Sequence, residues 1–189
     1  AFLDYSRPLK QSFGPTDLNE VVTRTIRLIQ NDLPTQIKLE VNLGEALAKI
    51  DGDAEQLKQV LINLVQNARQ AIGEKPGSIT VKTLKPERFG EFRGLEFVEI
   101  HVTDDGPGIP ENESELVFER FYRVLGNEAP GSGLGLAIVR EIAELHLGSV
   151  QLKPSPSGRG TLAQAVFPRR RFTISALLAQ SPEKFQPSL

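Results

Sequence analysis

The sequence DDGPGI at Asp104–Ile109 is informative together with GSGLGL at Gly131–Leu136 and two asparagines, Asn63 and Asn67. A carboxylate can accept a hydrogen bond from a base, amide oxygens can bind a metal ion, and glycine backbone can lie close to phosphates. Each piece alone is a weak signal. Their order along the chain indicates a binding site for ATP.

The composition is that of an ordinary globular domain. The chain has 189 residues, of which 39% are apolar and 24% charged. Its 22 lysines and arginines nearly balance 24 aspartates and glutamates, so the net charge does not favour binding to nucleic acid. The basic run at 169–171 is expected to be a solvated end of the domain. The absence of cysteine excludes disulfides, and two histidines make a zinc site improbable. No apolar run approaches the roughly 20 residues that cross a bilayer. A chain that begins with Ala1 and lacks methionine is expected to be a fragment.

Hydrophobic periodicity predicts interleaved helices and strands. The predicted helices cover residues 17–31, 53–72, 114–121 and 134–147. The predicted strands cover residues 37–41, 48–50, 78–84, 95–103, 149–153 and 161–167. We therefore expect an α/β fold, a two-layer sandwich of a mixed sheet against three helices, followed by a polar tail with one apolar patch at 174–178. The apolar face of the first helix is predicted to contain Val21, Val22, Thr25, Ile26, Leu28 and Ile29.

Asn63 and Asn67 lie one turn apart on one flank of the helix predicted at 53–72. Asparagine is unfavourable inside helices, so a pair of them needs a reason. Two solvated amides are one explanation. The alternative is that an amide oxygen faces a hard cation such as Mg²⁺, which accepts neutral oxygen ligands beside substrate phosphates. Gln59, one turn earlier, can belong to the same polar flank.

The two glycine stretches each have a structural and a functional explanation. An acidic hairpin turn accounts for DDGPGI, but a strand-end carboxylate there could also accept a hydrogen bond from an adenine amino group. GSGLGL could be a flexible linker, yet it leads into a helix whose N-terminus predicts an anion site. It is neither a P-loop, which needs G-x-x-x-x-G-K-[ST], nor a Rossmann turn, because it follows a loop and has the spacing G-x-G-x-G.

Four stretches in order resemble the sequence boxes of sensor histidine kinases. Residues 53–68 resemble the N box, Asp104–Ile109 the G1 box, FERFYR at Phe118–Arg123 the F box, and residues 131–139 the G2 box. The resemblance spans about residues 17–168. It implies the Bergerat fold of the GHKL superfamily, shared with gyrase, heat-shock 90 chaperones and MutL repair ATPases. The first half is similar to nitrogen-regulator-type kinases and the F box to osmosensor-like ones, so the subfamily and a chimeric origin stay open.

The resemblance implies a role for each box. Asn67 and Asn63 would hold Mg²⁺, Asp104 rather than Asp105 would read adenine, and residues 121–132 would form a flexible ATP lid. The implied catalytic residues are Asn63, Arg120 and Arg123. The implied nucleotide-binding residues are Asn63, Asn67, Asp104, Gly106, Gly108, Ile109, Tyr122, Gly131, Ser132, Gly133, Leu134, Gly135, Leu136 and Thr161.

The same resemblance implies domains and partners. Residues 1–12 would end a dimerisation helix, 13–168 would form the catalytic ATP-binding domain, and 169–189 would be a tail. Neither His101 nor His146 resembles the H box, so the phosphoacceptor domain would be missing. We expect a cytoplasmic domain that donates the γ-phosphoryl group of Mg·ATP to a histidine on that domain. The acceptor beyond it would be the receiver domain of a response regulator. We expect a homodimeric parent, which could be a membrane-bound sensor, and neither a membrane segment in this chain nor a nucleic-acid partner.

Two other functions stay open. A GHKL-type ATPase would hydrolyse ATP, but such enzymes generally carry a glutamate general base at the position of Asn63, and an amide cannot take a proton at neutral pH. A nucleotide-dependent interaction module would bind ATP and a partner without phosphotransfer.

Overall fold

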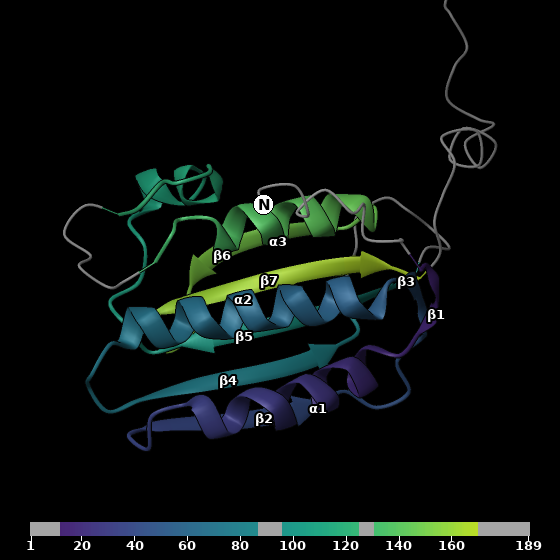
Figure 1. Cartoon of the computed structure of the whole chain (residues 1–189), viewed down its shortest axis with the longest axis horizontal. Coiled ribbons are helices and arrows are strands. Elements are labelled where there is room, and N and C mark those ends of the chain that lie inside the picture. Colours follow the sequence, from purple (N-terminus) through teal and green to yellow (C-terminus); the bar gives the residue numbers. More distant parts are fainter. Residues whose placement is uncertain (1–11, 87–95, 125–130, 170–189) are drawn as a thin grey trace, which may run out of the picture.

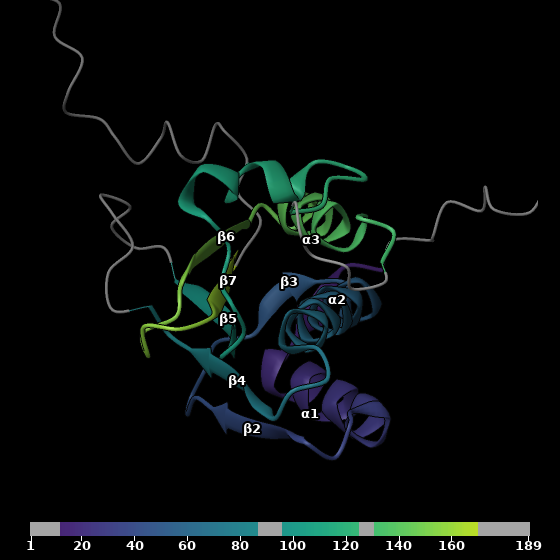
Figure 2. The same ribbon diagram turned by 90° about the vertical axis from the view of Figure 1, so that its left-hand side faces the viewer.

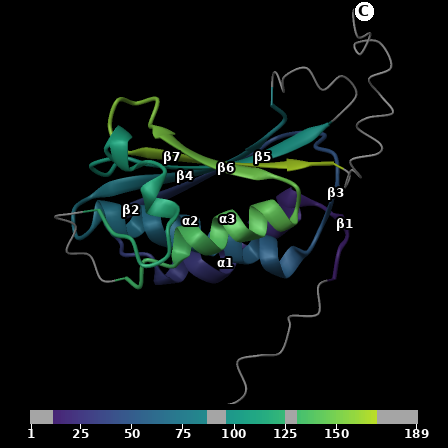
Figure 3. The same cartoon turned by 90° about the horizontal axis from the view of Figure 1, so that it is seen from above.

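The computed structural model describes residues 12–86, 96–124 and 131–169. Within these ranges three helices cover one face of a five-stranded sheet (Figures 1 and 2), and Figure 3 shows them together below the sheet. The helices are α1 (Leu18–Ile29), α2 (Ala54–Ile72) and α3 (Gly135–Leu145), with short 3-10 helices at Gln30–Asp32, Glu111–Glu113 and Leu116–Phe118. The strands are β1 (Gly14–Thr16), β2 (Ile37–Leu43), β3 (Ile50–Gly52), β4 (Gly77–Leu84), β5 (Phe97–Asp104), β6 (Ser149–Pro154) and β7 (Thr161–Pro168).

The sheet is mixed, as predicted. Its order is β2-β4-β5-β7-β6, with β2 and β4 parallel and the other neighbours antiparallel. A separate antiparallel pair joins β1 to β3, with Gly14 opposite Gly52. β5 is therefore the central strand, and because β7 pairs with it antiparallel, the end of β5 and the start of β7 meet at one edge of the sheet.

Aspartate side chains cap the N-termini of the first two helices. The Asp17 carboxylate accepts hydrogen bonds from the N–H groups of Asn19 (2.9 Å) and Glu20 (3.3 Å) at the start of α1. The Asp53 carboxylate likewise accepts from the first turn of α2, at 3.0 and 3.2 Å. Such caps satisfy backbone donors that have no partner inside a helix. Gly73 ends α2 with a φ of +70°, a conformation that favours glycine.

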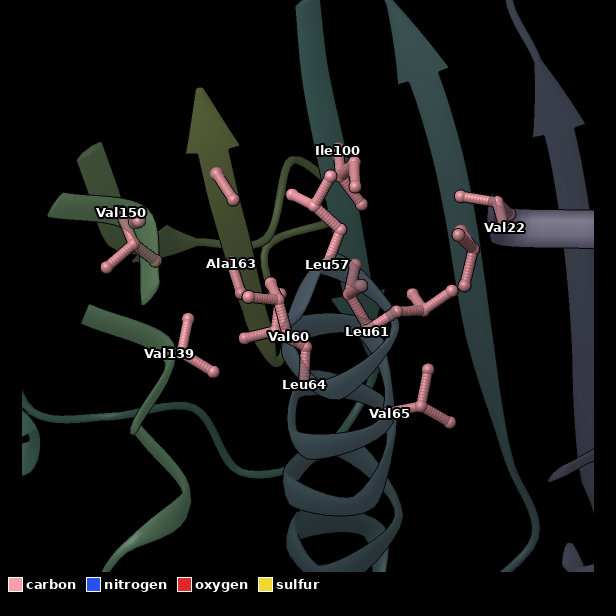
Figure 4. Packing of buried hydrophobic residues seen from close by; sticks show 14 of the residues in the cluster. Val22, Leu57, Val60, Leu61, Leu64, Val65, Ile100, Val139, Val150 and Ala163 are labelled. Carbon is pink, nitrogen blue, oxygen red and sulfur yellow. The ribbon is translucent and has the colours of Figure 1, made fainter. Parts of the chain in front are cut away.

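The core lies between α2 and the sheet. Figure 4 shows Leu57 of α2 pointing toward Ile100 of β5, while Val60 lies toward Ala163 of β7. Leu57, Val60 and Ile100 are fully buried. Because α2 packs over the middle of the sheet, its two flanks face α1 and α3 (Figure 1).

Several predicted details are wrong. The helix expected at 114–121 is replaced by a single 3-10 turn at Leu116–Phe118, because only Val117 and Phe118 there are buried and two buried residues do not make an apolar stripe. The strand expected at 48–50 is β3, two residues later, and β1 was not predicted. Leu28 is 63% exposed, since it lies outside the arc of α1 that packs on the core.

Other predictions lie outside the described residues. These are nearly all of the expected dimerisation-helix end at residues 1–12, half of the expected lid at 121–132, and the tail after Arg169 with its apolar patch. Over the described ranges, no helix combines the length and the apolar character that a bilayer span requires.

Candidate functional site

A cavity of about 840 Å³ opens between α2, α3 and the strands β5 and β7. Apart from Gly106 and Arg120, every site residue predicted from the sequence lines it. The lining residues that were predicted are Asn63, Asn67, Asp104, Gly108, Ile109, Tyr122, Arg123, Gly131, Ser132, Gly133, Leu134, Gly135, Leu136 and Thr161. Three stretches far apart in sequence therefore share one cavity.

Asp104 is a buried carboxylate with one oxygen occupied. It is 7% exposed, and its Oδ1 accepts hydrogen bonds from the N–H groups of Gly106 (2.8 Å) and Thr161 (3.3 Å). No donor among the described residues reaches Oδ2. Burial raises the pKa of Asp104 above its usual range, although the two N–H groups act in the opposite direction. A ligand with an N–H donor would find a fixed acceptor here.

The neighbouring Asp105 has a different environment. Its Oδ1 accepts from the N–H of Ser78 (2.9 Å) and its Oδ2 from the Ser78 hydroxyl (3.0 Å), which ties the end of β5 to the start of β4. Asp105 does not line the cavity. Of the two carboxylates, only Asp104 is available to a ligand.

We expect Asp105→Ala to lower the free energy of unfolding by about 2 kcal/mol, because two hydrogen bonds to a carboxylate are lost. Ligand affinity of the cavity should stay unchanged, since Asp105 does not face it. Urea unfolding followed by circular dichroism measures the first quantity and calorimetric titration the second. An unaltered unfolding midpoint would show that the tie to Ser78 contributes nothing.

Gly160 packs directly against the backbone of Asp104, and the sequence analysis did not identify it as part of the site. Its φ is +93°, and a Cβ there would lie 2.0 Å from the carbonyl oxygen of Asp104. Only glycine therefore lets the start of β7 come close enough for the N–H of Thr161 to reach the Asp104 carboxylate. The run GRGT at 158–161, directly before a predicted strand, was an available signal.

The polar flank of α2 faces the cavity as predicted. Asn63 is 7% exposed, and its Oδ1 accepts a hydrogen bond from the side-chain amide of Gln59 (3.1 Å). The Nδ2 atoms of Asn63 and Asn67 are buried, and neither has a hydrogen-bond partner among the described residues. A Cβ on Gly135 would lie 3.3 Å from the Asn67 Oδ1, so this amide faces the N-terminus of α3. Buried polar atoms usually have a hydrogen-bond partner, so these two nitrogens give the wall of the cavity unused polar capacity.

The glycine stretch brings two distant backbone segments together. Gly133 has a φ of +69°, and a Cβ there would lie 2.8 Å from the backbone of Phe121. The N–H of Phe121 donates to the carbonyl of Gly133 (2.9 Å), so the backbone at Phe121 is joined to the glycine stretch. The open N–H groups at the start of α3 carry partial positive charge toward the cavity.

The F-box residues take different positions. Tyr122 lines the cavity, and its hydroxyl donates to the Glu113 carboxylate (3.0 Å), which raises the tyrosine pKa. Arg123 also lines the cavity, at its exposed mouth. Arg120 lies outside the lining and forms an exposed ion pair with Glu141 of α3 (3.2 Å). The structure therefore brings one of the two predicted arginines to the site.

The apolar wall of the cavity was not identified from the sequence. It includes Val102 of β5, Ala163 of β7 and Leu152 of β6, and the open flank of α2 adds Gln66 and Gln70. The strand residues are alternating positions that face the helices, so the period-2 pattern could have located them once the strand order was known. Apolar side chains next to an acceptor suit a flat heterocyclic base.

The described residues contain no group of three or more histidine, cysteine or acidic side chains that could hold a metal ion by themselves. The cavity lining does contain the neutral amides of Asn63 and Asn67, and Mg²⁺ accepts neutral oxygen ligands beside phosphates.

Comparison with known proteins identifies relatives of this arrangement. Residues 52–171 match the family described as "Histidine kinase-, DNA gyrase B-, and HSP90-like ATPase". The sensor histidine kinase ZraS of Klebsiella oxytoca is 35% identical over 161 residues, which cover 85% of this chain and 32% of that protein. The sensory histidine kinase/phosphatase NtrB of the same organism is 33% identical over 142 residues, covering 74% of this chain and 40% of NtrB. The chain thus spans about a third of the length of the first of these relatives.

Solved structures agree with the sequence relatives. A mycobacterial sensor histidine kinase, MprB, superposes with a TM-score of 0.67 at 30% identity, covering 85% of this chain and all of that one. The catalytic domain of histidine kinase ThkA superposes with a TM-score of 0.68 at 28% identity, covering 85% of this chain and 99% of that one. The predicted Bergerat fold is confirmed.

Proposed function

The chain belongs to the family of histidine kinase-, DNA gyrase B- and HSP90-like ATPases, and from this premise we propose that it is the catalytic domain of a sensor histidine kinase. It binds Mg·ATP in the cavity and donates the γ-phosphoryl group to a histidine on an adjoining dimerisation domain. One observation carries the proposal. A buried carboxylate, two asparagine amide nitrogens without a partner among the described residues, and a glycine-rich helix N-terminus surround one cavity.

The adenine base is assigned to the end of the cavity at Asp104. Its Oδ2 accepts the 6-amino group, and Val102 and Ala163 pack against the ring. Gly108, with a φ of +82°, keeps the backbone clear of the base. The phosphates extend toward Gly131–Leu136, where backbone N–H groups at the start of α3 neutralise part of their charge.

Asn67 and Asn63 are assigned to the Mg²⁺ ion. The amides of Gln59 and Asn63 can both turn over and keep one hydrogen bond between them, which brings the Asn63 oxygen to the position now held by the unpartnered nitrogen. The donor set of two neutral amides therefore fits a cation that also takes phosphate oxygens and waters. When bound, Mg²⁺ would neutralise charge on the β- and γ-phosphates.

Phosphotransfer in this arrangement depends on position and charge. The acceptor imidazole nitrogen attacks the γ-phosphorus, the bond to the β–γ bridging oxygen breaks, and ADP leaves with the electron pair. We assign Arg123, which lines the cavity, to the γ-phosphate end, whereas Arg120 lies outside the lining and is paired with Glu141. No residue of this chain needs to remove a proton, because a neutral imidazole is already a nucleophile.

Asn63 argues against the clamp-ATPase alternative. It lies on the cavity flank of α2, where a hydrolase would need a general base for water, and a neutral amide cannot serve as one. ThkA has also been solved in complex with the response regulator TrrA, at 26% identity to this chain. By analogy, the phosphoryl group would pass from the histidine to an aspartate on a response regulator.

Incubating this chain alone with γ-labelled ATP should give neither labelled protein nor appreciable ATP hydrolysis. Adding a separate dimerisation domain that carries a phosphoacceptor histidine should give slow labelling of that partner, with an acid-labile, base-stable product. The rate should be low, because covalent linkage normally supplies the effective concentration. Asn63→Glu is the matched variant, and it should gain weak hydrolysis if position 63 faces the attacking group. Robust ATP turnover by the unaltered chain would favour the clamp ATPase.

A further inference from the structure

The segment that enters the domain at Ser12 is bound to both helices that border the cavity. The N–H of Ser12 donates to Oδ2 of Asp53, the cap of α2 (2.9 Å). Phe13 packs against the ring of His146, the C-terminal cap of α3, with ring centroids 4.8 Å apart. We name the group Ser12, Phe13, Asp53 and His146 the junction clasp.

His146 is the centre of the junction clasp. It is 1% exposed, its Nε2 accepts a hydrogen bond from the N–H of Asp53 (3.0 Å), and its Nδ1 donates to the carbonyl of Ile142 (2.8 Å). A backbone N–H can only donate, so Nε2 carries no proton and the ring is neutral. The imidazole therefore links the first turn of α2 to the last turn of α3 through one fixed tautomer.

The imidazole ring of His146 is closely packed by its neighbours. Phe167 of β7 contacts the other side of His146, with centroids 5.9 Å apart and the rings near perpendicular. A Cβ on Gly52 of β3 would lie 3.2 Å from the imidazole Cδ2, so β3 approaches the ring as closely as glycine permits. Because β1 follows Ser12 and Phe13 directly and pairs with β3, the entering segment is hydrogen-bonded to the strand that packs against His146. A displacement of that segment must displace a helix end.

The cavity lies along the C-terminal half of α2 and at the N-terminal end of α3, away from the junction clasp. Asn63 and Asn67 follow Asp53 by ten and fourteen residues along α2, about 15–21 Å, and Gly135 precedes His146 by a similar length of α3. At that end the Asn67 amide is 3.3 Å from the position of a Gly135 Cβ. Since helices are stiff, a tilt of a few degrees at the junction clasp moves the Asn67–Gly135 gap by about 1 Å, enough to change binding or catalysis strongly.

We propose that the junction clasp is a positioning device that couples the entering segment at Ser12 to the spacing of α2 and α3, and thereby to the affinity of the cavity for Mg·nucleotide. The inference rests on the proposed function, because it assumes that the cavity binds nucleotide between these helices. It assigns His146 a positioning role, since the side chain lies away from the cavity. Coupling is reciprocal, so nucleotide must also stabilise the junction clasp.

Two variants of the chain test the coupling. His146→Phe retains an aromatic ring but removes both hydrogen bonds, and Ser12→Pro removes the N–H that reaches Asp53 without altering the sequence of either helix. Thr83→Val is the matched control for His146→Phe, because Thr83 is as buried as His146. The Thr83 hydroxyl links Asn19 to Gly44 at a site remote from α3. All are titrated with ADP, with and without Mg²⁺, at a temperature where each is fully folded.

We expect His146→Phe to weaken Mg·ADP binding about fivefold to tenfold and Ser12→Pro to weaken it in the same direction, mainly in the Mg²⁺-dependent part. Thr83→Val should change affinity by less than about twofold while it loses similar stability. ADP should also slow amide exchange at Ser12 and Asp53 in the unaltered chain. Equal affinities of the clasp variants and the unaltered chain would overturn the coupling alone. An unaltered chain that binds no nucleotide would overturn the proposed function.

Discussion

Asn67→Ala is expected to abolish the magnesium-dependent part of nucleotide binding, a loss of about tenfold to a hundredfold in affinity for Mg·ATP. The Asn67 amide is aimed at the start of α3, where the phosphates are proposed to lie, and its nitrogen has no partner among the described residues. Alanine removes the only oxygen that this side chain could offer to a cation. Calorimetric titration with Mg²⁺ and with EDTA separates the metal-dependent part from the rest.

The same substitution should leave the fold intact or slightly more stable. It removes a buried amide without a partner and places a better helix former inside α2. Arg69→Ala is the control, because Arg69 is exposed on the same helix and does not line the cavity. If Asn67→Ala and the unaltered chain bind nucleotide equally in both buffers, Asn67 does not hold the metal ion.

Much of the site could be predicted because its parts are local. Asp53 caps its own helix, and helical spacing then fixes Asn63 and Asn67 on one flank of α2 whatever the rest of the chain does. The choice between Asp104 and Asp105 came from the family resemblance, yet β-strand alternation also decides it. Asp104 shares the parity of Val102 and the other β5 residues that face the helices, and Asp105 does not.

The rest depends on contacts between distant residues, which local patterns do not contain. The partner of Arg120 is Glu141 on another helix, so the sequence could not show that this arginine lies outside the cavity. The role of Gly160 appears only when β7 is placed beside β5. The hydrogen bond between His146 and the N–H of Asp53 joins residues 93 positions apart, which no local pattern could reveal.

Asp104→Asn should lower ATP affinity about a hundredfold and erode the preference of the cavity for adenine over guanine. The two N–H groups of Gly106 and Thr161 fix the orientation of the new amide, because they require its oxygen at the position of Oδ1. The amide nitrogen then occupies the position of Oδ2, where a donor faces the adenine amino group but suits a 6-oxo purine. The ratio of ATP to GTP affinity, measured by competition, reports this change directly.

Stability distinguishes this outcome from simple misfolding. The folded pKa of Asp104 is raised by burial above that of the unfolded chain, so the unfolded state binds fewer protons and stability falls as pH rises between the two values. At neutral pH the ionised carboxylate therefore lowers stability, and Asp104→Asn should unfold at an equal or higher urea concentration than the unaltered chain. The difference in stability should vanish below the ordinary aspartate pKa of about 3.9.

Asp105→Ala is the control and should show the opposite pattern, lower stability with nucleotide affinity retained. An unchanged ATP-to-GTP ratio in Asp104→Asn would mean that Asp104 is not the residue that reads the base.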